Sequence, residues 1–253
     1  MEANPLIRYL CYQLYHARVI LHSLQYEGKV EQIHDFRIAL RHIRSLVKLF
    51  PKDTAPFPKA LKSVMKATNP IRELDVLLDS FSPSHYPKLF KQLTQLREES
   101  FTTLFTREFA VQTLLLLEEY ATLLHQNNPH IIPEIMIQRV LTQYQHCLDT
   151  HHTLEPGTTS KTLHRLRIDY KDARYGFEFL EISDLHPCRE LILFCKQRQN
   201  QLGAVQDAAN QIKRLKKLIH EFPSSEVKEI LRKRKKALQR LKDTTQQVLS
   251  PST

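Results

Sequence analysis

Five basic side chains recur at helical spacing near the start of the sequence. On an α-helix with 3.6 residues per turn they share one arc of about 80°: His34, Arg37, Arg41, Arg44 and Lys48, the first stripe. Cations at such spacings repel one another, so an anion with closely spaced charges would stabilise the helix. Arginine bonds two phosphate oxygens at once, and lysine adds a point charge. The first stripe therefore predicts a surface that binds a polyanion.

A second set of cations repeats this spacing at an offset of 130 residues. It consists of His164, Arg167, Lys171 and Arg174, the second stripe. Glu178 stands at the position that corresponds to Lys48. Two such stripes facing each other would form a strongly positive cleft. The alternative interpretation, ion pairs to acidic residues elsewhere in the protein, remains open at this point.

Both stripes require amphipathic helices to carry them. Apolar residues beside the first stripe form a predicted core face: Ile33, Phe36, Leu40, Ile43, Val47 and Phe50. The corresponding face of the second helix is Leu163, Leu166, Tyr170, Ala173, Phe177 and Leu180. Ile38, Leu46 and Leu49 lie on the other side of the first stripe, which predicts that it lines a groove.

The whole chain is predicted to be helical. Only four glycines occur in 253 residues, and most of the thirteen prolines fall between periodic segments. Strand-rich folds use more glycine in turns and bulges, so we predict an all-α fold. The apolar periodicity places helices near 6–26, 31–50, 57–80, 85–126 (as two helices), 131–152, 160–181, 187–221 and 224–248.

The offset of 130 residues also predicts an internal duplication. Residues 33–38 recur as 163–168, and the pairs His16/His146 and His22/His152 share the same offset. We expect one domain, residues 1–253, with repeats at about 1–128 and 129–253. Each repeat would be a bundle of about four helices, and the boundary would fall near Asn127–Pro129.

The charge balance favours an anionic partner. Lysine and arginine number 37 against 27 aspartates and glutamates, for a net charge of +10. The four cysteines form no CxxC pair and suggest reduced thiols, without zinc or a disulfide framework. No apolar run is typical of a signal peptide or a membrane span, so we expect a cytoplasmic protein. No metal site or cofactor is predicted.

Common catalytic signatures are missing. The sequence has no GxxxxGK[ST], GxSxG or HExxH pattern and no carboxylate cluster typical of two-metal phosphohydrolases. We therefore expect a protein without enzymatic activity. The alternative is a phosphohydrolase or phosphotransferase in which His34 and His164 act as acid, base or nucleophile. A second alternative is nucleic-acid binding, although the stripes lack aromatic residues for stacking, apart from Tyr175 beside the second.

A further basic run, Lys228–Lys242, near the C-terminus is typical of a solvated helix face. It would also add to the attraction of any polyanion.

The residues of both stripes resemble the CHAD family, helical domains known for binding inorganic polyphosphate. The family's basic helix matches His34, Arg37, Arg41 and Arg44 in the first half and His164, Arg167, Lys171, Arg174 and Tyr175 in the second. Its arginine–acid–x–aspartate motif matches Arg72-Glu73-Leu74-Asp75, with Glu73 in place of aspartate. Its Leu-Gly-x-x-Asn-Asp motif matches residues 202–207, with Gln206 in place of asparagine. Thr68-Asn69 replaces Leu-Gly ahead of Arg72.

The resemblance implies two four-helix bundles related by a pseudo-twofold axis around a basic central channel. Polyphosphate would be bound by both stripes, with Arg72, Glu73, Asp75 and Asp207 in support. Carboxylates next to arginines would hold the guanidinium groups in place. The implied role is a targeting or scaffolding module, associated with polyphosphate granules.

Overall fold

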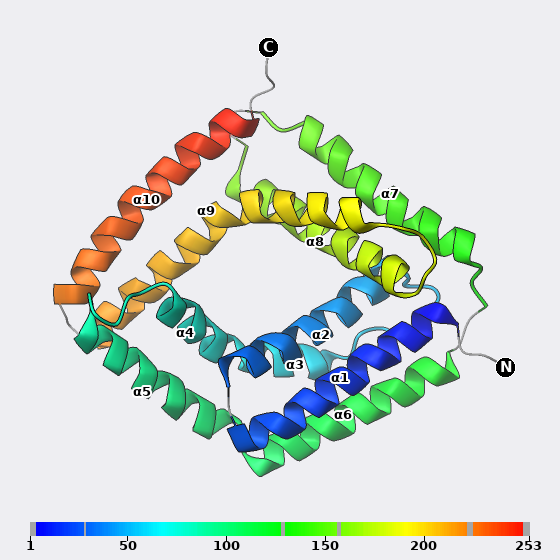
Figure 1. The fold of residues 1–253 in the computed structure, drawn as a ribbon, viewed down its shortest axis with the longest axis horizontal. Coiled ribbons are helices and arrows are strands. Elements are labelled where there is room, and N and C mark those ends of the chain that lie inside the picture. The colour runs from blue at the N-terminus through cyan, green and yellow to red at the C-terminus, as the bar shows by residue number, and fades with distance from the viewer. Residues whose placement is uncertain (1–3, 28, 128–129, 156–157, 222–224, 250–253) are drawn as a thin grey trace.

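The computed structural model describes residues 4–27, 29–127, 130–155, 158–221 and 225–249. These parts of the chain form ten α-helices and no strand, which confirms the all-α class (Figure 1). The helices are α1 (Pro5–Glu27), α2 (Val30–Leu49), α3 (Lys59–Ala67), α4 (Asn69–Asp79), α5 (Pro87–Leu104), α6 (Arg107–Gln126), α7 (Pro133–His152), α8 (Ser160–Ile182), α9 (Arg189–Glu221) and α10 (Ser225–Leu249).

One predicted helix is wrong. Residues 57–80 form two helices, α3 and α4, which meet at Thr68. Pro70 is the second residue of α4 and has no N–H to donate, so the α3 hydrogen-bond pattern cannot continue through it. The break turns the chain and places Asn69 and Arg72 beside α2.

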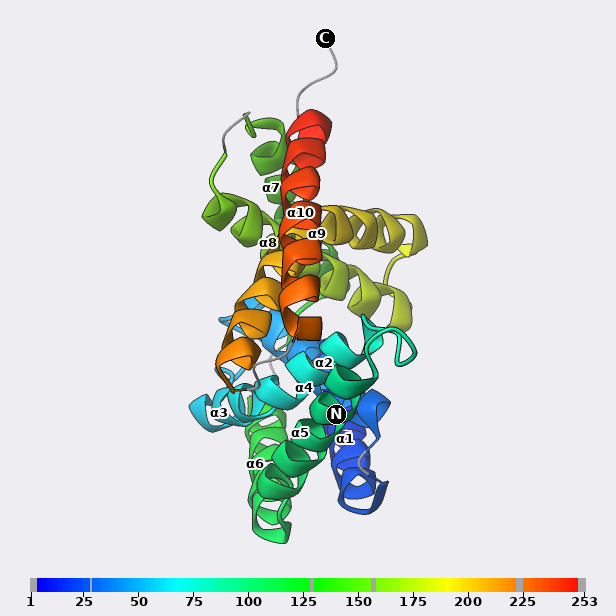
Figure 2. The ribbon, with the colours of Figure 1, turned by 90° about the vertical axis from the view of Figure 1, so that its left-hand side faces the viewer.

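The helices of the two halves of the chain lie in different parts of the molecule. Figure 2 shows α1, α3, α4, α5 and α6 in its lower part and α7, α8 and α9 in its upper part. In Figure 1, α1, α5, α6, α7 and α10 lie on the periphery, and α2, α4, α8 and α9 lie nearer the middle. The two halves meet where α2 packs against α8. Both stripes are therefore on helices at the junction of the halves.

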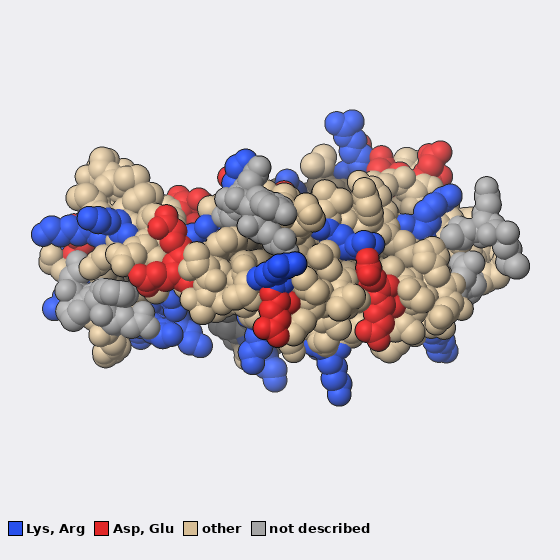
Figure 3. All heavy atoms as spheres, turned by 90° about the horizontal axis from the view of Figure 1, so that it is seen from below, with Lys and Arg blue, Asp and Glu red and all other residues tan. Residues whose placement is uncertain are grey.

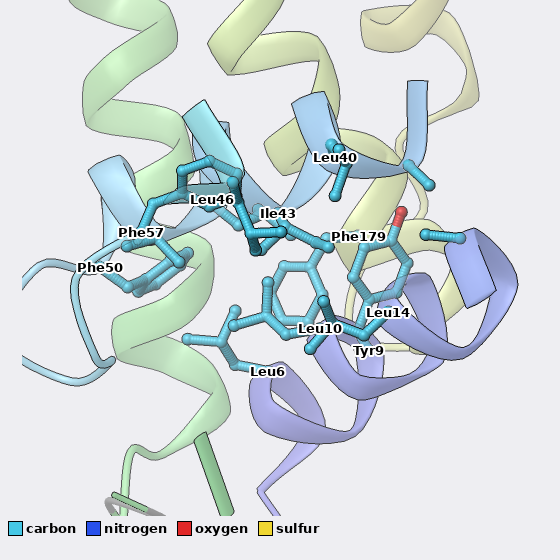
Figure 4. Packing of buried hydrophobic residues seen from close by; sticks show 14 of the residues in the cluster. Leu6, Tyr9, Leu10, Leu14, Leu40, Ile43, Leu46, Phe50, Phe57 and Phe179 are labelled. Carbon is cyan, nitrogen blue, oxygen red and sulfur yellow. The ribbon is translucent and has the colours of Figure 1, made fainter. Parts of the chain in front are cut away.

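The larger hydrophobic cluster extends across this junction. The predicted core face of α2 is buried throughout, and on α8 only Leu163 is partly exposed. Figure 4 shows Tyr9 and Leu10 of α1 and Leu40 and Ile43 of α2 gathered around Phe179 of α8. Each buried large apolar side chain contributes about 1.5–3 kcal/mol to folding. The apolar faces thus fix the orientation of the two basic stripes.

A smaller cluster joins the halves at the other end of the molecule. Leu74 and Leu77 of α4 and Leu89 of α5 pack with Leu215 of α9 and Val227 of α10. The backbone N–H of Leu89 also donates to Glu226 Oε2 at 2.8 Å. This cluster closes the ring of helices seen in Figure 1.

Neither hydrophobic cluster is confined to one predicted repeat. The internal duplication stays a prediction, and its boundary at residues 128–129 lies outside the described residues.

Candidate functional site

Two adjoining pockets open between the central helices. The first has a volume of about 600 Å³ and is lined by residues of α2, α4, α8 and α9. The second has a volume of about 420 Å³ and is lined by residues of α2, α3 and α8 and by Asn69 at the start of α4. Arg37, Arg41 and Asn69 line both pockets. We call the two together the central cleft.

Arg37 is fixed by neutral oxygen atoms at the junction of α3 and α4. Its Nη1 donates to Thr68 Oγ1 at 2.6 Å and to the Met65 carbonyl, and its Nη2 donates to Asn69 Oδ1. Burial lowers the pKa of Arg37 to about 10, and nearby Arg41 and Arg72 contribute to this. Arg37 therefore fixes the junction of α3 and α4, and the neutral oxygen atoms that it contacts do not cancel its positive charge.

Arg41 and Arg44 have no carboxylate partner among the described residues. Arg41 Nε donates to the Arg37 carbonyl at 3.2 Å. Burial lowers the pKa of Arg41; Tyr175 acts against this, whereas Arg72, Arg174 and Arg167 lower it further. Arg44 is exposed and lines the second pocket. The middle of the first stripe thus carries charge that the protein does not compensate.

The second stripe is compensated residue by residue. Three ion pairs join its cations to acidic side chains: Arg167 Nη2–Asp207 Oδ2 at 3.5 Å, Lys171 Nζ–Asp172 Oδ1 at 3.4 Å and Arg174 Nη1–Glu178 Oε1 at 3.2 Å. For the second stripe, the alternative interpretation of ion pairs to acidic residues of the protein agrees with the structure. Arg167 and Lys171 still line the central cleft.

Gly203 of α9 is explained by the position of Arg167. A Cβ at this residue would lie 2.7 Å from Arg167 Nε. Any larger residue would push the guanidinium from its place beside the first pocket. The glycine therefore lets α9 pass close to the second stripe.

Lys48 connects the two stripes. Its Nζ lies 2.7 Å from Asp172 Oδ2 and 3.6 Å from Asp169 Oδ1, both on α8. The Ser45 hydroxyl donates to Asp172 Oδ1 at 2.7 Å. Asp172 is 2 % exposed, and these donors compensate its burial. The spacing of the basic residues does not predict this pairing, although Asp169 and Asp172 stand three residues apart on a mainly apolar face.

The two candidate histidines occupy different environments. His34 lines the first pocket, and burial with the neighbouring Arg72 and Arg41 lowers its pKa. Its Nδ1 is buried and has no hydrogen-bond partner among the described residues. His164 is exposed and lines neither pocket of the central cleft. The structure therefore does not bring them together.

The four predicted supporting residues also differ. Asp75 is fully buried, accepts from Arg97 Nε at 3.1 Å and lies 4.0 Å from Arg72 Nη1. Burial raises its pKa, against the hydrogen bond from Arg97. Arg72, Glu73 and Asp207 line the first pocket, and Glu73 has no ion-pair partner among the described residues. Asp75 thus mainly holds α4 against α5 through Arg97, and its contact with Arg72 of the cleft is longer.

The cleft contains further polar residues that the two stripes do not predict. Lys62 and Lys66 of α3 line the second pocket, and Arg214 of α9 lines the first. The spacing of Lys62 and Lys66, four residues apart, places them on one helix face and was an available signal. Arg214 follows Asp207 by two helical turns, but only the packing of α9 shows that it faces the cleft.

A buried polar chain lies behind the stripes. Tyr9 Oη is 3.0 Å from His42 Nδ1, and His42 Nε2 is 3.3 Å from Glu178 Oε2. Burial, with Arg174 and Arg41 nearby, lowers the pKa of His42 to about 3. Burial raises the pKa of Glu178, against the nearby Arg174. This chain links α1 and α2 to the Arg174 end of the second stripe.

The exterior differs from the cleft in its charge pattern. On the edge seen in Figure 3, lysine and arginine side chains are interspersed with aspartate and glutamate. Across the described residues no group of three or more histidine, cysteine, aspartate or glutamate side chains is arranged to hold a metal ion. Within the same residues, no helix has the length and apolar character needed to cross a membrane.

The fold and the cleft define an all-helical protein with cations concentrated where its two halves meet. The sequence model of the CHAD domain matches residues 13–216, and the chain belongs to the CHAD family. A crystal structure of the CHAD domain from the plant Ricinus communis has the same fold, with a TM-score of 0.69 and 20% sequence identity. The match covers 98% of this chain and 86% of that chain. No match was found among curated proteins.

Proposed function

We propose that this protein binds inorganic polyphosphate in the central cleft, without chemical turnover. The observation that carries the proposal is the position of Arg41. It lines the first pocket with Arg72 and Arg167, burial and the nearby charges of Arg72, Arg174 and Arg167 lower its pKa, and its Nε donates to the Arg37 carbonyl. Arg72 and Arg167 each have a nearby carboxylate, whereas Arg41 has none among the described residues, so a polyanion in the pocket would compensate the charge of Arg41.

Polyphosphate suits this arrangement better than an isolated phosphate. The cations are spread along α2 and around two adjoining pockets, so one small anion could contact only some of them. A linear polymer with a charge on every unit could contact both pockets at once. Membership of the CHAD family supports the same ligand, because the resemblance to this family implies binding of inorganic polyphosphate.

The placement of the histidines supports binding without turnover. An acid and a base that act on one phosphate group must both face it. His34 lines the first pocket, whereas His164 is exposed outside both pockets. A role as a scaffolding or targeting module at cytoplasmic polyphosphate granules is part of this proposal.

The experiment compares two single variants that remove the same charge. Arg41→Gln removes the guanidinium at the centre of the cleft, and Arg8→Gln removes an exposed one on α1. We expect the affinity for long-chain polyphosphate to fall at least tenfold in Arg41→Gln and less than twofold in Arg8→Gln, because a buried charge-assisted contact is lost only in the first. Equal affinities in both variants would overturn the proposal.

Two further measurements separate the alternatives. Single-stranded RNA at the same salt concentration should compete weakly, since the first stripe offers no stacking residue. Phosphate release from polyphosphate should stay at background with or without added magnesium. Release that disappears in His34→Gln while binding persists would establish the enzyme instead.

A further inference from the structure

A third pocket lies at the C-terminal end of the first stripe, outside the central cleft. It has a volume of about 630 Å³ and lies between the end of α2 and the middle of α7. We call it the outer pocket. Its basic lining residues are Lys48, Lys52, Arg139 and His146. Of these, only Lys48 belongs to a stripe.

The outer pocket continues the basic lining of the central cleft. Lys48 lines both the second pocket and the outer pocket. From His34 to Lys48 the first stripe runs about 21 Å along α2, at 1.5 Å per residue. Lys52 follows one turn beyond, where α2 has ended. A chain that follows the stripe out of the cleft would therefore arrive at this pocket.

The cations of the outer pocket are available to an anion in different degrees. Lys48 is 53 % exposed and has an ammonium group with three donors, so its ion pairs to Asp169 and Asp172 leave it able to contact solvent. Lys52 is exposed and has no ion-pair partner among the described residues. Arg139 is paired with Asp53 and lies over the Phe50 ring at 5.6 Å, so it forms a fixed wall.

Two electrostatic effects act in opposite directions on an anion in the outer pocket. The last carbonyl groups of α2 carry partial negative charge, which disfavours an anion. The full positive charge of Lys52 outweighs a partial charge of about half a unit, whereas the charge of Lys48 is shared with Asp169 and Asp172. The exposed side chains of Thr142 and His146 add hydrogen-bonding groups from α7.

We propose that the outer pocket is an additional subsite, which binds the part of a long polyphosphate chain that extends beyond the central cleft. This inference rests on the proposed function. It implies a dependence on chain length: tripolyphosphate would be bound within the cleft alone, and only a long chain would reach Lys52 and His146.

The test uses the full chain and two ligands, tripolyphosphate and long-chain polyphosphate. In the double variant Lys52→Gln/His146→Gln, we expect the affinity for the long chain to fall about three- to tenfold. The slope of its logarithm against log salt should decrease by about 0.7–0.9, the contribution of one released counterion. The affinity for tripolyphosphate should not change. The matched control, Lys91→Gln/His125→Gln, alters two exposed residues on α5 and α6 and should match the parent with both ligands.

Each outcome distinguishes the subsite from the proposed function. If Lys52→Gln/His146→Gln binds both ligands as the parent does, while Arg41→Gln is weakened, the subsite is overturned and the proposed function stands. Equal weakening towards both ligands also overturns the subsite, because it shows no dependence on length. If the parent binds neither ligand, both proposals fail.

Discussion

The two stripes have matching spacing and opposite electrostatic surroundings. Every cation of the second stripe after His164 has a carboxylate within 3.5 Å. In the first stripe, Arg37 and Arg41 are hydrogen-bonded to neutral oxygens, and within the described parts of the chain only Lys48 contacts carboxylates. Similar sequence patterns therefore give one helix whose cations are paired with carboxylates and one whose central cations are not paired among the described residues.

The difference assigns separate tasks to the two helices. Paired cations on α8 are already positioned, so they shape the cleft with little stored repulsion. Unpaired cations on α2 repel one another in the free protein and gain the most from an incoming polyanion. Affinity is thus expected to depend mainly on α2, and cleft geometry mainly on α8.

The largest expected effect comes from removing unpaired charge. Arg41→Gln/Arg44→Gln should weaken polyphosphate binding on the order of 100-fold, because each lost charge-assisted contact costs about 1.5 kcal/mol or more. Arg167→Gln/Asp207→Asn removes a whole ion pair and leaves the net charge unchanged, so its loss should be only a few-fold. Dissociation constants at one salt concentration measure both. If the two double variants lose affinity equally, the contrast between the stripes is wrong.

A second prediction concerns Arg37, the member of the first stripe that is hydrogen-bonded to the α3–α4 junction. Arg37→Gln should lower the free energy of unfolding by about 2 kcal/mol, since hydrogen bonds from a charged group are lost at the α3–α4 junction. Arg44→Gln, which removes an exposed arginine of the same helix, should leave stability unchanged or slightly raised. Urea unfolding measures both. A stable Arg37→Gln variant would contradict the structural role of Arg37.

The third prediction concerns how stability depends on pH through His42, which lies where α2 packs against α8. Because the pKa of His42 is lowered to about 3 from its ordinary 6.5, only the unfolded chain binds this proton between those values. Stability should therefore fall as the pH drops below 6.5, by up to about 1.4 kcal/mol per pH unit. Glu178 acts in the opposite sense, since its raised pKa lets the folded state take up a proton first.

His42→Gln should flatten this dependence, and the exposed-site variant His125→Gln should retain it. Urea unfolding at pH 7 and pH 5.5 provides the comparison. An unchanged loss of stability in His42→Gln would show that His42 is not the group responsible.

The smallest expected effect is a gain. Asp207→Asn removes a carboxylate that is 57 % exposed and lies 3.5 Å from Arg167. Arg167 would then be unpaired, as Arg41 is, and polyphosphate affinity should rise about threefold, the size typical of an exposed ion pair. Glu229→Gln, which breaks an ion pair with Lys233 on α10, is the matched control and should have no effect. Weaker binding in Asp207→Asn would mean that Asp207 positions Arg167 and does not compete with phosphate.

The sequence predicted the helices and the first stripe because both depend on local periodicity. The core face of α2 follows from spacing alone, and the structure buries all of it. The break at Thr68 was missed although Pro70 was visible, because the apolar pattern continues across it. Local reasoning failed there by giving periodicity more weight than a missing backbone donor.

Pairings between distant residues could not be predicted in this way. Lys48 and Asp172 are on different helices, and nothing in either segment shows that they meet. The same holds for Arg97, which contacts Asp75 from the next helix. The compensation of the second stripe therefore became visible only in three dimensions, even though Glu178 had marked it as different.

The small cluster of α4, α5, α9 and α10 has a consequence for the order of folding. It joins residues 74–93 to residues 215–230, so its formation closes a very long loop at a large entropic cost. Such non-local contacts form slowly compared with contacts inside a helix pair. The walls of the central cleft come from α2, α3, α4, α8 and α9, and this cluster joins the α4 wall to the α9 wall. During synthesis the first stripe on α2 therefore emerges long before α8 and α9, which supply the other walls of its cleft, have been made.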